Sequence, residues 1–538
     1  MTISPLKRLQ ILQAAEFETW GIRTMSINED TPNDKALWEK IKTGYFQHLI
    51  VQPEQLKSFR GHMPRLARLL HVPQFTKTIS RVHFDEIHFH HTAGLPHYGL
   101  PAFRPAWGSL NELTLRLPKG TPIQALSGTL PPHIKAAVID HLNFDPATFL
   151  SLKLSSNRPN IIYCTHRIVG SLSDFRNLDF LVSIPFTRLL KVVIYHDDTQ
   201  QCSDAANYTD NRLPLHLRKT GIVRHYHSGM SKEYLKQVFD DFSNPNGVCK
   251  ILHATEGVST GLHVDDIDAV VDYGVPQHKT TAQQRAGRCG RRGQLAVYLA
   301  MAEPWAYTVS LDAVDPENKD PDQPISGRLL KNAKKRERAG LAMIRYVRST
   351  ICLREMIRRY LADNSDNALT ISTEWCCDLD HPGEPSKRFD KSTFFPGRFI
   401  YADDSGAIYA GDIGDPDRIH LNPKTNKRKP KGPPNRKIHF VLLALPDPTA
   451  IKRLSIAHPS RITSAANIVY IIQETEEWAV EWSSQIFDII SGYDGELERD
   501  SILVRLRKLH ERQRRSRSKM RMNIASHRPR RRSPTDLG

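Results

Sequence analysis

Three arginines stand in a short glycine-containing stretch near the middle of the chain. Arg285, Arg288 and Arg291 lie three residues apart in the sequence QRAGRCGR, residues 284–291. A guanidinium group stays charged and offers planar donors that match phosphate oxygens, and glycine allows a tight turn. The stretch therefore predicts either arginines that reach a nucleoside triphosphate across a domain cleft, or a basic loop that contacts nucleic acid.

A pair of acids is the second feature that could do chemistry. Asp85 and Glu86 directly follow a short apolar segment, residues 81–84. Ligands of open α/β sheets bind beyond the carboxyl ends of the strands. At such an edge Asp85 is suited to hold Mg²⁺, and Glu86 to orient or deprotonate an attacking water. Acids are also favoured at the N-terminus of a helix, and the pair taken alone does not exclude that simpler role.

The elements that position these residues can be read from hydrophobic patterning. Short segments rich in Ile, Val and Tyr alternate with helical periodicity up to about residue 300, which is typical of buried parallel strands in an α/β protein. A break at residues 152–159 separates two such halves. The expected fold class is α/β, with two parallel-sheet domains, the first incomplete, then a helical segment and a small C-terminal α+β region with a basic tail. Strands are expected at residues 47–51, 81–84, 122–126, 160–164, 222–226, 250–253, 269–273 and 295–300. Beyond them we expect helix over residues 330–361 with Lys and Arg on one face, a strand at residues 438–445 and helix over residues 464–509.

Seven further strings lie in order along residues 4–293, and together with QRAGRCGR they resemble the motifs of superfamily-2 helicases. The stretch 284–291 resembles motif VI and Asp85-Glu86-Ile87-His88 resembles the DExH box. Within that superfamily the chain is identified as RecQ-like, because Phe103-Arg104-Pro105-Ala106-Trp107 is similar to the aromatic-rich loop of RecQ proteins. The other strings are Ser4-Pro5-Leu6 (motif Ia), Gln52-Pro53-Glu54 (Ib), Ser127-Gly128-Thr129 (III), Ile161-Ile162-Tyr163-Cys164 (IV), Tyr226–Met230, and Ala254-Thr255 with Thr260-Gly261-Leu262 (V).

The resemblance implies two RecA-like domains that bind ATP with Mg²⁺ between them and single-stranded and duplex DNA across them. The implied activity is ATP-dependent 3′-to-5′ DNA unwinding. It assigns catalysis to Asp85, Glu86, Arg288 and Arg291, with Asp85 on Mg²⁺. It assigns coupling to His88, Ser127, Thr129 and Gln284, the nucleotide and interlobe face to Gly261, Arg285 and Gly287, and DNA contact to Phe103, Arg104, Trp107 and Thr255. The aromatic residues Phe103 and Trp107 are equally consistent with core packing.

The sequence departs from the family in one important place. No G-x-x-x-x-G-K-[ST] loop occurs, and no Gly-Lys pair exists anywhere in the 538 residues. That loop normally cradles the phosphates of the nucleotide. Motif Ia begins at Ser4, so we expect a chain truncated after the loop, with impaired nucleotide binding and hydrolysis. Two alternatives to the active DNA helicase remain: a helicase relic that only binds nucleic acid, and a DExH RNA helicase.

A zinc site is implied by the resemblance in the segment after the two domains. RecQ proteins carry a zinc-binding element there, and this chain offers Cys352, Cys376, Cys377 and His381. Zinc prefers four tetrahedral Cys or His ligands. The family's C-x₂-C ending is missing, and adjacent cysteines rarely bind one ion comfortably. The alternative is a decayed site with free thiols.

Charge and composition bound the remaining functions. The net charge is +17, and residues 505–532 hold 13 Lys or Arg against one acid. A basic tail of this kind binds phosphates without sequence preference or serves as a nuclear-import signal, so a nuclear protein is expected. The sequence has no apolar run of 18 residues, so a membrane span is not expected. The expected domains are residues 1–152, 153–305, 306–390 (helical, zinc), 391–437 (linker), 438–510 and 511–538 (tail).

Overall fold

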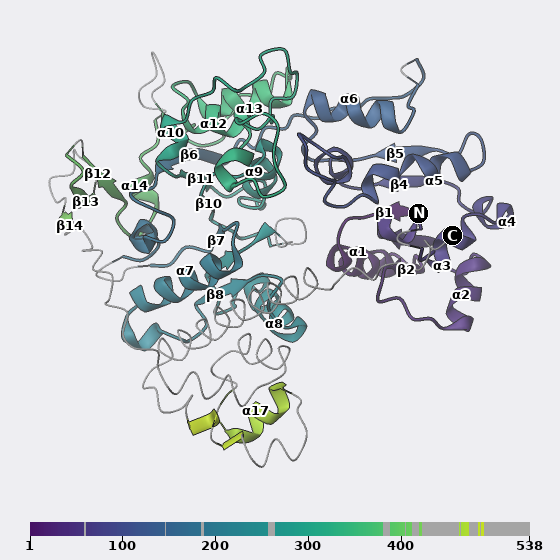
Figure 1. The fold of residues 1–538 in the computed structure, drawn as a ribbon, viewed down its shortest axis with the longest axis horizontal. Coiled ribbons are helices and arrows are strands. Elements are labelled where there is room, and N and C mark those ends of the chain that lie inside the picture. The colour runs from purple at the N-terminus through teal and green to yellow at the C-terminus, as the bar shows by residue number, and fades with distance from the viewer. Residues whose placement is uncertain are drawn as a thin grey trace, which may run out of the picture. The chain divides into compact units, whose positions relative to one another are not determined.

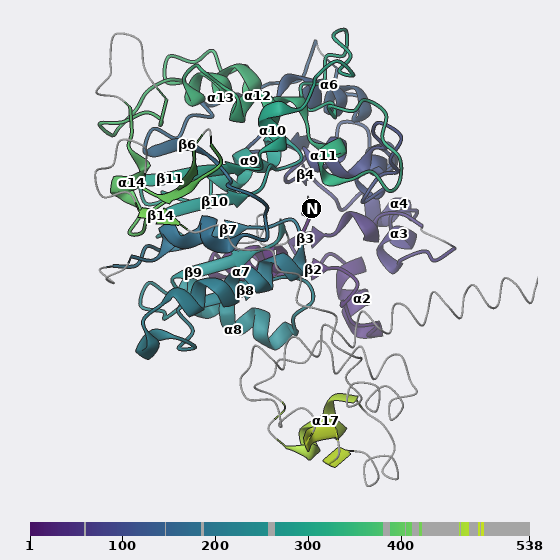
Figure 2. The same cartoon turned by 60° about the vertical axis from the view of Figure 1, so that its left-hand side comes forward.

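The structure is a computed structural model (Figures 1 and 2). The chain divides into two compact units, Met1–Pro423 and Lys424–Gly538, and each is described by itself. The residues described are 1–58, 61–145, 147–183, 188–256, 264–379, 388–403, 405–411, 419–421, 462, 464–472, 483–484 and 486–488. Within these ranges no helix is long and apolar enough to cross a membrane.

The first lobe is a five-stranded parallel sheet with helices between its strands. Its order is β2-β3-β1-β4-β5. Asp34 caps α2 by accepting hydrogen bonds from two backbone amides, and proline opens both α4 and α6, as expected at helix starts. The elements are β1 (Thr2–Ile3), α1 (Lys7–Thr19), β2 (Thr24–Ile27), α2 (Lys35–Lys42), β3 (His48–Val51), η1 (Pro53–Gln55), α3 (Arg65–Leu69), α4 (Pro73–Thr76), β4 (Val82–Phe84), η2 (His90–Gly94), η3 (Trp107–Ser109), α5 (Asn111–Arg116), β5 (Ile123–Ala125) and α6 (Pro132–His141).

The register of this sheet brings the ends of its strands to one edge. Ile3 of β1 pairs with Val51 of β3 and with Phe84 of β4, and Phe84 pairs with Ala125 of β5. The residues that follow these strands therefore lie on the same edge, since all the strands are parallel. Ile3, Val51 and Phe84 have no exposed surface and belong to the core of the lobe.

The second lobe is a six-stranded parallel sheet of order β6-β11-β10-β7-β9-β8. Every residue of β7, β9, β10 and β11 is buried, because helices and loops cover both faces of the sheet with two separate apolar clusters. Figures 1 and 2 show α7 and α8 beside β8. The elements are β6 (Ile161–Arg167), η4 (Phe175–Leu181), β7 (Val192–Tyr195), α7 (Thr199–Arg212), η5 (Leu215–Leu217), β8 (Val223–Tyr226), α8 (Lys232–Ser243), β9 (Ile251–Ala254), β10 (Ala269–Tyr273), α9 (Lys279–Ala286) and β11 (Ala296–Ala302).

The predicted fold class is confirmed, because both sheets are parallel and their strands alternate with helices. All eight strands expected up to residue 300 are present, and β1, β2 and β7 are additional. After the second sheet the expected continuous helix over residues 330–361 is instead three shorter ones. These are α11 (Lys335–Arg338), α12 (Leu341–Val347) and α13 (Leu353–Leu361), preceded by α10 (Trp305–Thr308).

The expectation of an unstructured linker at residues 391–437 is wrong over its first part. A turn of helix, α14 (Lys391–Phe394), leads into an antiparallel sheet of β12 (Ile400–Ala402), β13 (Ile408–Ala410) and β14 (Ile419–Leu421). The ring of Phe399 stacks on Phe180 of η4 at 4.4 Å between centroids, which attaches this sheet to the second lobe. The strand expected at residues 438–445 lies outside the described residues. In the second unit α17 (Ala465–Ile472) is helical, as expected for residues 464–509.

Candidate nucleotide and nucleic-acid site

The acid pair lies at the edge of the first sheet, directly beyond β4. The Asp85 carboxylate accepts a hydrogen bond from Gln13 Nε2 of α1 at 3.1 Å. Burial, and then the neighbouring charge of Glu86, raises the pKa of Asp85. Glu86 adopts a left-handed backbone with φ of 51°, which costs a residue other than glycine about 1–2 kcal/mol. Strain of this kind is concentrated at functional sites.

His88 joins the acid pair to the two other stretches predicted to couple the lobes. Its Nδ1 lies 2.9 Å from Ser127 Oγ and 3.3 Å from Glu86 Oε2, and its Nε2 lies 2.6 Å from Gln284 Nε2. An amide nitrogen can only donate, so in the neutral ring Nε2 accepts and Nδ1 carries the proton toward Ser127. Ser127 Oγ in turn donates to the carbonyl of Thr129 at 3.1 Å. The structure thus brings the four predicted coupling residues into one hydrogen-bonded chain between the lobes.

Arg288 is the arginine of the second lobe that acts on the acid pair. Burial alone would raise the pKa of Glu86, but the His88 ring 3.3 Å away, together with the charge of Arg288, lowers it below its usual value. The pKa of Arg291 falls to about 10, because the side chain is buried and close to Arg288, while Asp265 of its own lobe opposes the shift. The charge of Arg288 thus reaches Glu86 of the first lobe, whereas the acid that acts on Arg291 belongs to the second lobe.

Arg285 has an internal role that the sequence did not indicate. Its side chain is 2% exposed and donates from Nη1 to Asp272 Oδ1 at 2.6 Å and from Nη2 to Glu256 Oε2 at 3.2 Å. It also packs 4.7 Å from the Tyr195 ring. Because Asp272 is fully buried, this pair holds α9 against β10. Gly287 ends α9, and its carbonyl accepts from Arg158 at 3.3 Å.

The aromatic-rich loop divides into three different roles. Phe103 is 85% exposed, as a base-stacking residue needs to be. Trp107 has no exposed surface and lies 5.7 Å from the Phe89 ring, so its predicted DNA contact is wrong and it belongs to the core. Arg104 is committed to protein contacts rather than to DNA, since it donates to both carboxylate oxygens of Glu54 at 2.9 and 2.8 Å and to the Pro5 carbonyl at 2.8 Å.

A cleft of about 1080 Å³ opens between the two lobes beside His88 and Gln284. The exposed Phe103 lines it from the first lobe, and Thr255, directly after β9, lines it from the second. Lys331 and Arg338 contribute positive charge along its side, and Lys335 is paired there with Asp197 at 2.8 Å. In the sequence these three residues were recognisable only as part of a basic helix face, because nothing in their spacing indicates that the segment returns to the lobe interface.

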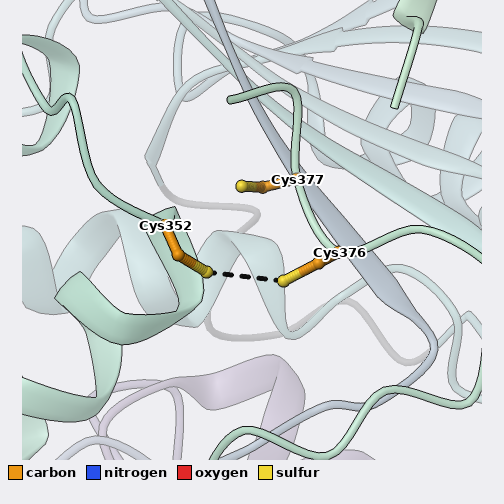
Figure 3. A group of neighbouring side chains, drawn as sticks. All are labelled: Cys352, Cys376 and Cys377. Carbon is orange, nitrogen blue, oxygen red and sulfur yellow. Dashed lines mark hydrogen bonds between the residues drawn. The ribbon is translucent and has the colours of Figure 1, made fainter. Parts of the chain in front are cut away.

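The three predicted zinc-binding cysteines come together (Figure 3). Their sulfur atoms all lie within 4.8 Å of one another, and Cys352 Sγ is 3.4 Å from Cys376 Sγ. The hydrogen bond between the sulfurs of Cys352 and Cys376 is the main cause that lowers the pKa of the Cys376 thiol. A thiol that deprotonates easily is a good zinc ligand. His381, the fourth expected ligand, and Gly261 of motif V lie outside the described residues.

Comparison with known proteins finds one matching domain and several distant relatives. Residues 178–293 match the helicase conserved C-terminal domain. The ATP-dependent DNA helicase RecQ of Pasteurella multocida is 23% identical over 398 residues, which are 72% of this chain and 54% of that protein. Nucleolar RNA helicase 2-A of Xenopus laevis is 27% identical over 134 residues, 23% of this chain and 17% of that protein. The chain therefore spans about half the length of the RecQ relative.

Two solved helicase structures are less identical in sequence to this chain than the relatives above. S. cerevisiae Dbp5 bound to RNA and ADP BeF3 covers 56% of this chain and 70% of its own, at 16% identity and a TM-score of 0.41. The DUF1998 helicase MrfA bound to DNA and AMPPNP covers 57% of this chain and 42% of its own, at 16% identity and a TM-score of 0.42. Residues 178–293 of this chain match a helicase domain, and 72% of the chain is similar to a RecQ DNA helicase.

Proposed function

We propose that this protein is an ATP-dependent DNA helicase of RecQ type, which unwinds duplex DNA while moving 3′ to 5′ along one strand. The observation that carries the proposal is the contact of His88 with both Ser127 and Gln284. Through it, the segment that holds the acid pair is hydrogen-bonded to the helix that leads into Arg288. A movement of one lobe against the other would change this contact, which is what coupling nucleotide to DNA requires.

The residues present fit one end of a magnesium-bound nucleotide. Asp85 would hold the ion, Glu86 would orient the attacking water, and Arg288 would stabilise charge on the transferred phosphoryl group. The bound nucleotide supplies the free energy for lobe closure. The other end of the nucleotide, which a Gly-Lys loop would cradle, has no counterpart in the 538 residues. We therefore propose that these residues bind and hydrolyse ATP weakly by themselves.

The cleft between the lobes supports the proposed contact with nucleic acid. Phe103 presents an exposed ring for base stacking, and Lys331 and Arg338 offer charge for phosphates. DNA is favoured over RNA because the RecQ relative aligns with 72% of the chain, whereas the RNA helicases of Xenopus and human align with 23% and 20%. The basic tail supports a nuclear location and added affinity for DNA.

A second candidate is a nucleic-acid-binding protein without helicase activity, which the absence of a Gly-Lys pair favours. Three measurements on the 538-residue chain separate the candidates: oligonucleotide binding, DNA-stimulated ATP hydrolysis, and unwinding of tailed duplexes. The helicase proposal expects unwinding of 3′-tailed but not 5′-tailed DNA, abolished in Glu86→Gln and kept in Glu16→Gln on the exposed face of α1. Tight DNA binding with no hydrolysis selects the second candidate, and unwinding of RNA in preference to DNA selects an RNA helicase.

We also propose that Cys352, Cys376 and Cys377 bind one zinc ion, with a fourth ligand that His381 is placed in sequence to supply. The three thiols fit because their sulfurs converge from a helix start and a loop. Thiolates are preferred zinc ligands. Metal analysis of purified protein should find one zinc ion fewer per chain in Cys352→Ser than in the wild type, and an unchanged zinc content in Cys202→Ser, a buried cysteine of α7 outside the cluster. Zinc content unchanged by Cys352→Ser would contradict the site.

A further inference from the structure

A second group of metal-ligating side chains lies apart from both the acid pair and the cysteines. It consists of His133 on α6 of the first lobe and of Asp320 and Asp322 in the segment between α10 and α11. One ligand atom from each lies within 4.8 Å of the other two. The group therefore draws its members from two parts of the chain that are nearly 190 residues apart.

His133 is the observation that points to a ligand. Its side chain is only 10% exposed, and neither Nδ1 nor Nε2 has a hydrogen-bond partner. Burying a polar ring without partners is costly. Nε2 lies 3.4 Å from Asp320 Oδ1, which is longer than a good hydrogen bond but suits two ligands that share one ion.

The two carboxylates are held in place by other hydrogen bonds. Asp320 accepts from the Tyr98 hydroxyl at 2.7 Å and from the Asp322 amide at 2.8 Å. Asp322 accepts from the Lys279 amide at 2.9 Å and from the Tyr360 hydroxyl. Each carboxylate oxygen keeps a further lone pair. Such outer contacts orient the ligands of protein metal sites and add to their affinity.

We propose that His133, Asp320 and Asp322 bind one divalent transition-metal ion of the zinc class, which links the first lobe to the segment that follows the second. An imidazole with two carboxylates suits Zn²⁺, whereas Mg²⁺ and Ca²⁺ take oxygen ligands. Three protein ligands leave the fourth zinc position for water. This inference does not depend on the helicase proposal, because none of the three ligands has a proposed role at the nucleotide or DNA, although Asp322 also lines the cleft beside His88.

The ion would strengthen a contact that already exists between these parts of the chain. Tyr98 of the first lobe donates to Asp320, and its carbonyl accepts from the Leu329 amide at 2.5 Å. The metal adds a bond from α6 to the same segment. Its binding therefore favours the lobe arrangement of this structure, since a ligand that binds one arrangement shifts the population toward it.

Zinc content of the full chain tests the proposal, measured after saturation with Zn²⁺ and gel filtration. His133→Asn and Asp320→Asn should each hold one zinc ion fewer per chain than the wild type. The matched controls are His216→Asn, an exposed histidine of η5, and Asp312→Asn, an exposed aspartate before Asp320. Both controls should keep the wild-type content, whether or not the cysteines hold a further ion. Equal zinc in all five proteins overturns the site.

Cobalt spectroscopy of the wild type supplies a measurement that needs no variant to fold. The proposal expects bound Co²⁺ to include a species that has tetrahedral d–d absorption without thiolate-to-cobalt charge transfer. Zn²⁺ should also slow amide hydrogen exchange in α6 of the wild type. Cobalt bound only with charge-transfer absorption, together with unchanged exchange in α6, would assign all the metal to the cysteines and overturn the site.

Discussion

Phe103 and Trp107 stand four residues apart in one aromatic loop, yet their environments predict opposite phenotypes. Trp107 is fully buried and Phe103 is 85% exposed. Replacing Trp107 by Ala should lower the free energy of unfolding by about 3–5 kcal/mol, because it leaves a large cavity. Replacing Phe103 by Ala should change it by less than about 0.5 kcal/mol. Urea denaturation followed by circular dichroism measures both.

The Phe103→Ala variant also tests whether this loop contacts nucleic acid. Phe103→Ala should weaken binding of a labelled single-stranded oligonucleotide by about 1–3 kcal/mol, the value of one stacked base. Fluorescence anisotropy at fixed salt gives the affinity. Wild-type affinity in Phe103→Ala would show that this exposed ring is not a stacking platform.

At the scale of elements, the attachment of the β12–β14 sheet depends on one glycine. A Cβ added at Gly397 would lie 2.2 Å from the Asp179 carbonyl oxygen and 2.6 Å from the Val182 carbonyl oxygen. The Gly397 amide donates to the Phe180 carbonyl at 2.8 Å. Gly397→Ala should therefore push the sheet away from η4. Faster amide hydrogen exchange in β12 and η4, with unchanged exchange in β9, is the expected result.

Local sequence patterns predicted most of the strands whose own residues form an apolar, β-branched run. The strands that precede Asp85, Thr255 and the arginine stretch were all found, because they are short apolar runs with β-branched residues. β1 has only two residues and β2, Thr-Met-Ser-Ile, only four, so their signal is weak. β7 reads Val-Val-Ile-Tyr and was not predicted, although its own residues form a clear apolar run. The β12–β14 sheet was missed because three-residue strands among Gly, Asp and Pro resemble a loop, and their pairing is set by tertiary contacts.

The sequence predicted those residues of the candidate site that directly follow a strand. Parallel register brings Asp85 and Ser127 to one edge, and that geometry follows from the order of the strands. The sequence could not show that Arg285 turns inward to the buried Asp272, because the spacing of the arginines is the same for an inward and an outward side chain. The grouping of His133 with Asp320 depends on how the lobes meet, which no local pattern encodes.

At the scale of the whole molecule, buried histidines should make the fold sensitive to mild acid. Burial lowers the pKa of His166 to about 3, the pKa of His196 to about 3 and the pKa of His90 to about 4. The unfolded chain binds these protons near pH 6.5, so their stabilisation is complete above that pH and falls as the pH drops toward the folded values. Each histidine should cost up to about 1.4 kcal/mol per pH unit.

Urea denaturation at pH 7.5, 6.5, 5.5 and 5.0 measures this decline in a window above the usual range of carboxyl groups. His166→Gln should reduce the slope of unfolding free energy against pH by the share of one histidine. The Nε2 atom of His166 hydrogen-bonds the Ile400 carbonyl at 3.2 Å, and the glutamine amide can also reach this carbonyl. A flat profile from pH 7.5 to 5.0 would contradict the prediction.

The charge of the molecule is concentrated in its last residues, and this determines how the whole chain should respond to salt. Ending the chain after Val504 removes 13 basic and two acidic residues and lowers the net charge from +17 to +6. Each phosphate that the tail no longer neutralises should reduce the slope of log affinity against log salt by about 0.7 for single strands. The shortened chain should therefore bind an oligonucleotide more weakly at low salt and approach the wild type at high salt.

Removal of residues 533–538 alone, which contain no Lys or Arg, should leave the slope unchanged. If both truncations give the wild-type slope, the tail does not bind nucleic acid, and the cleft beside Phe103 accounts for the binding by itself.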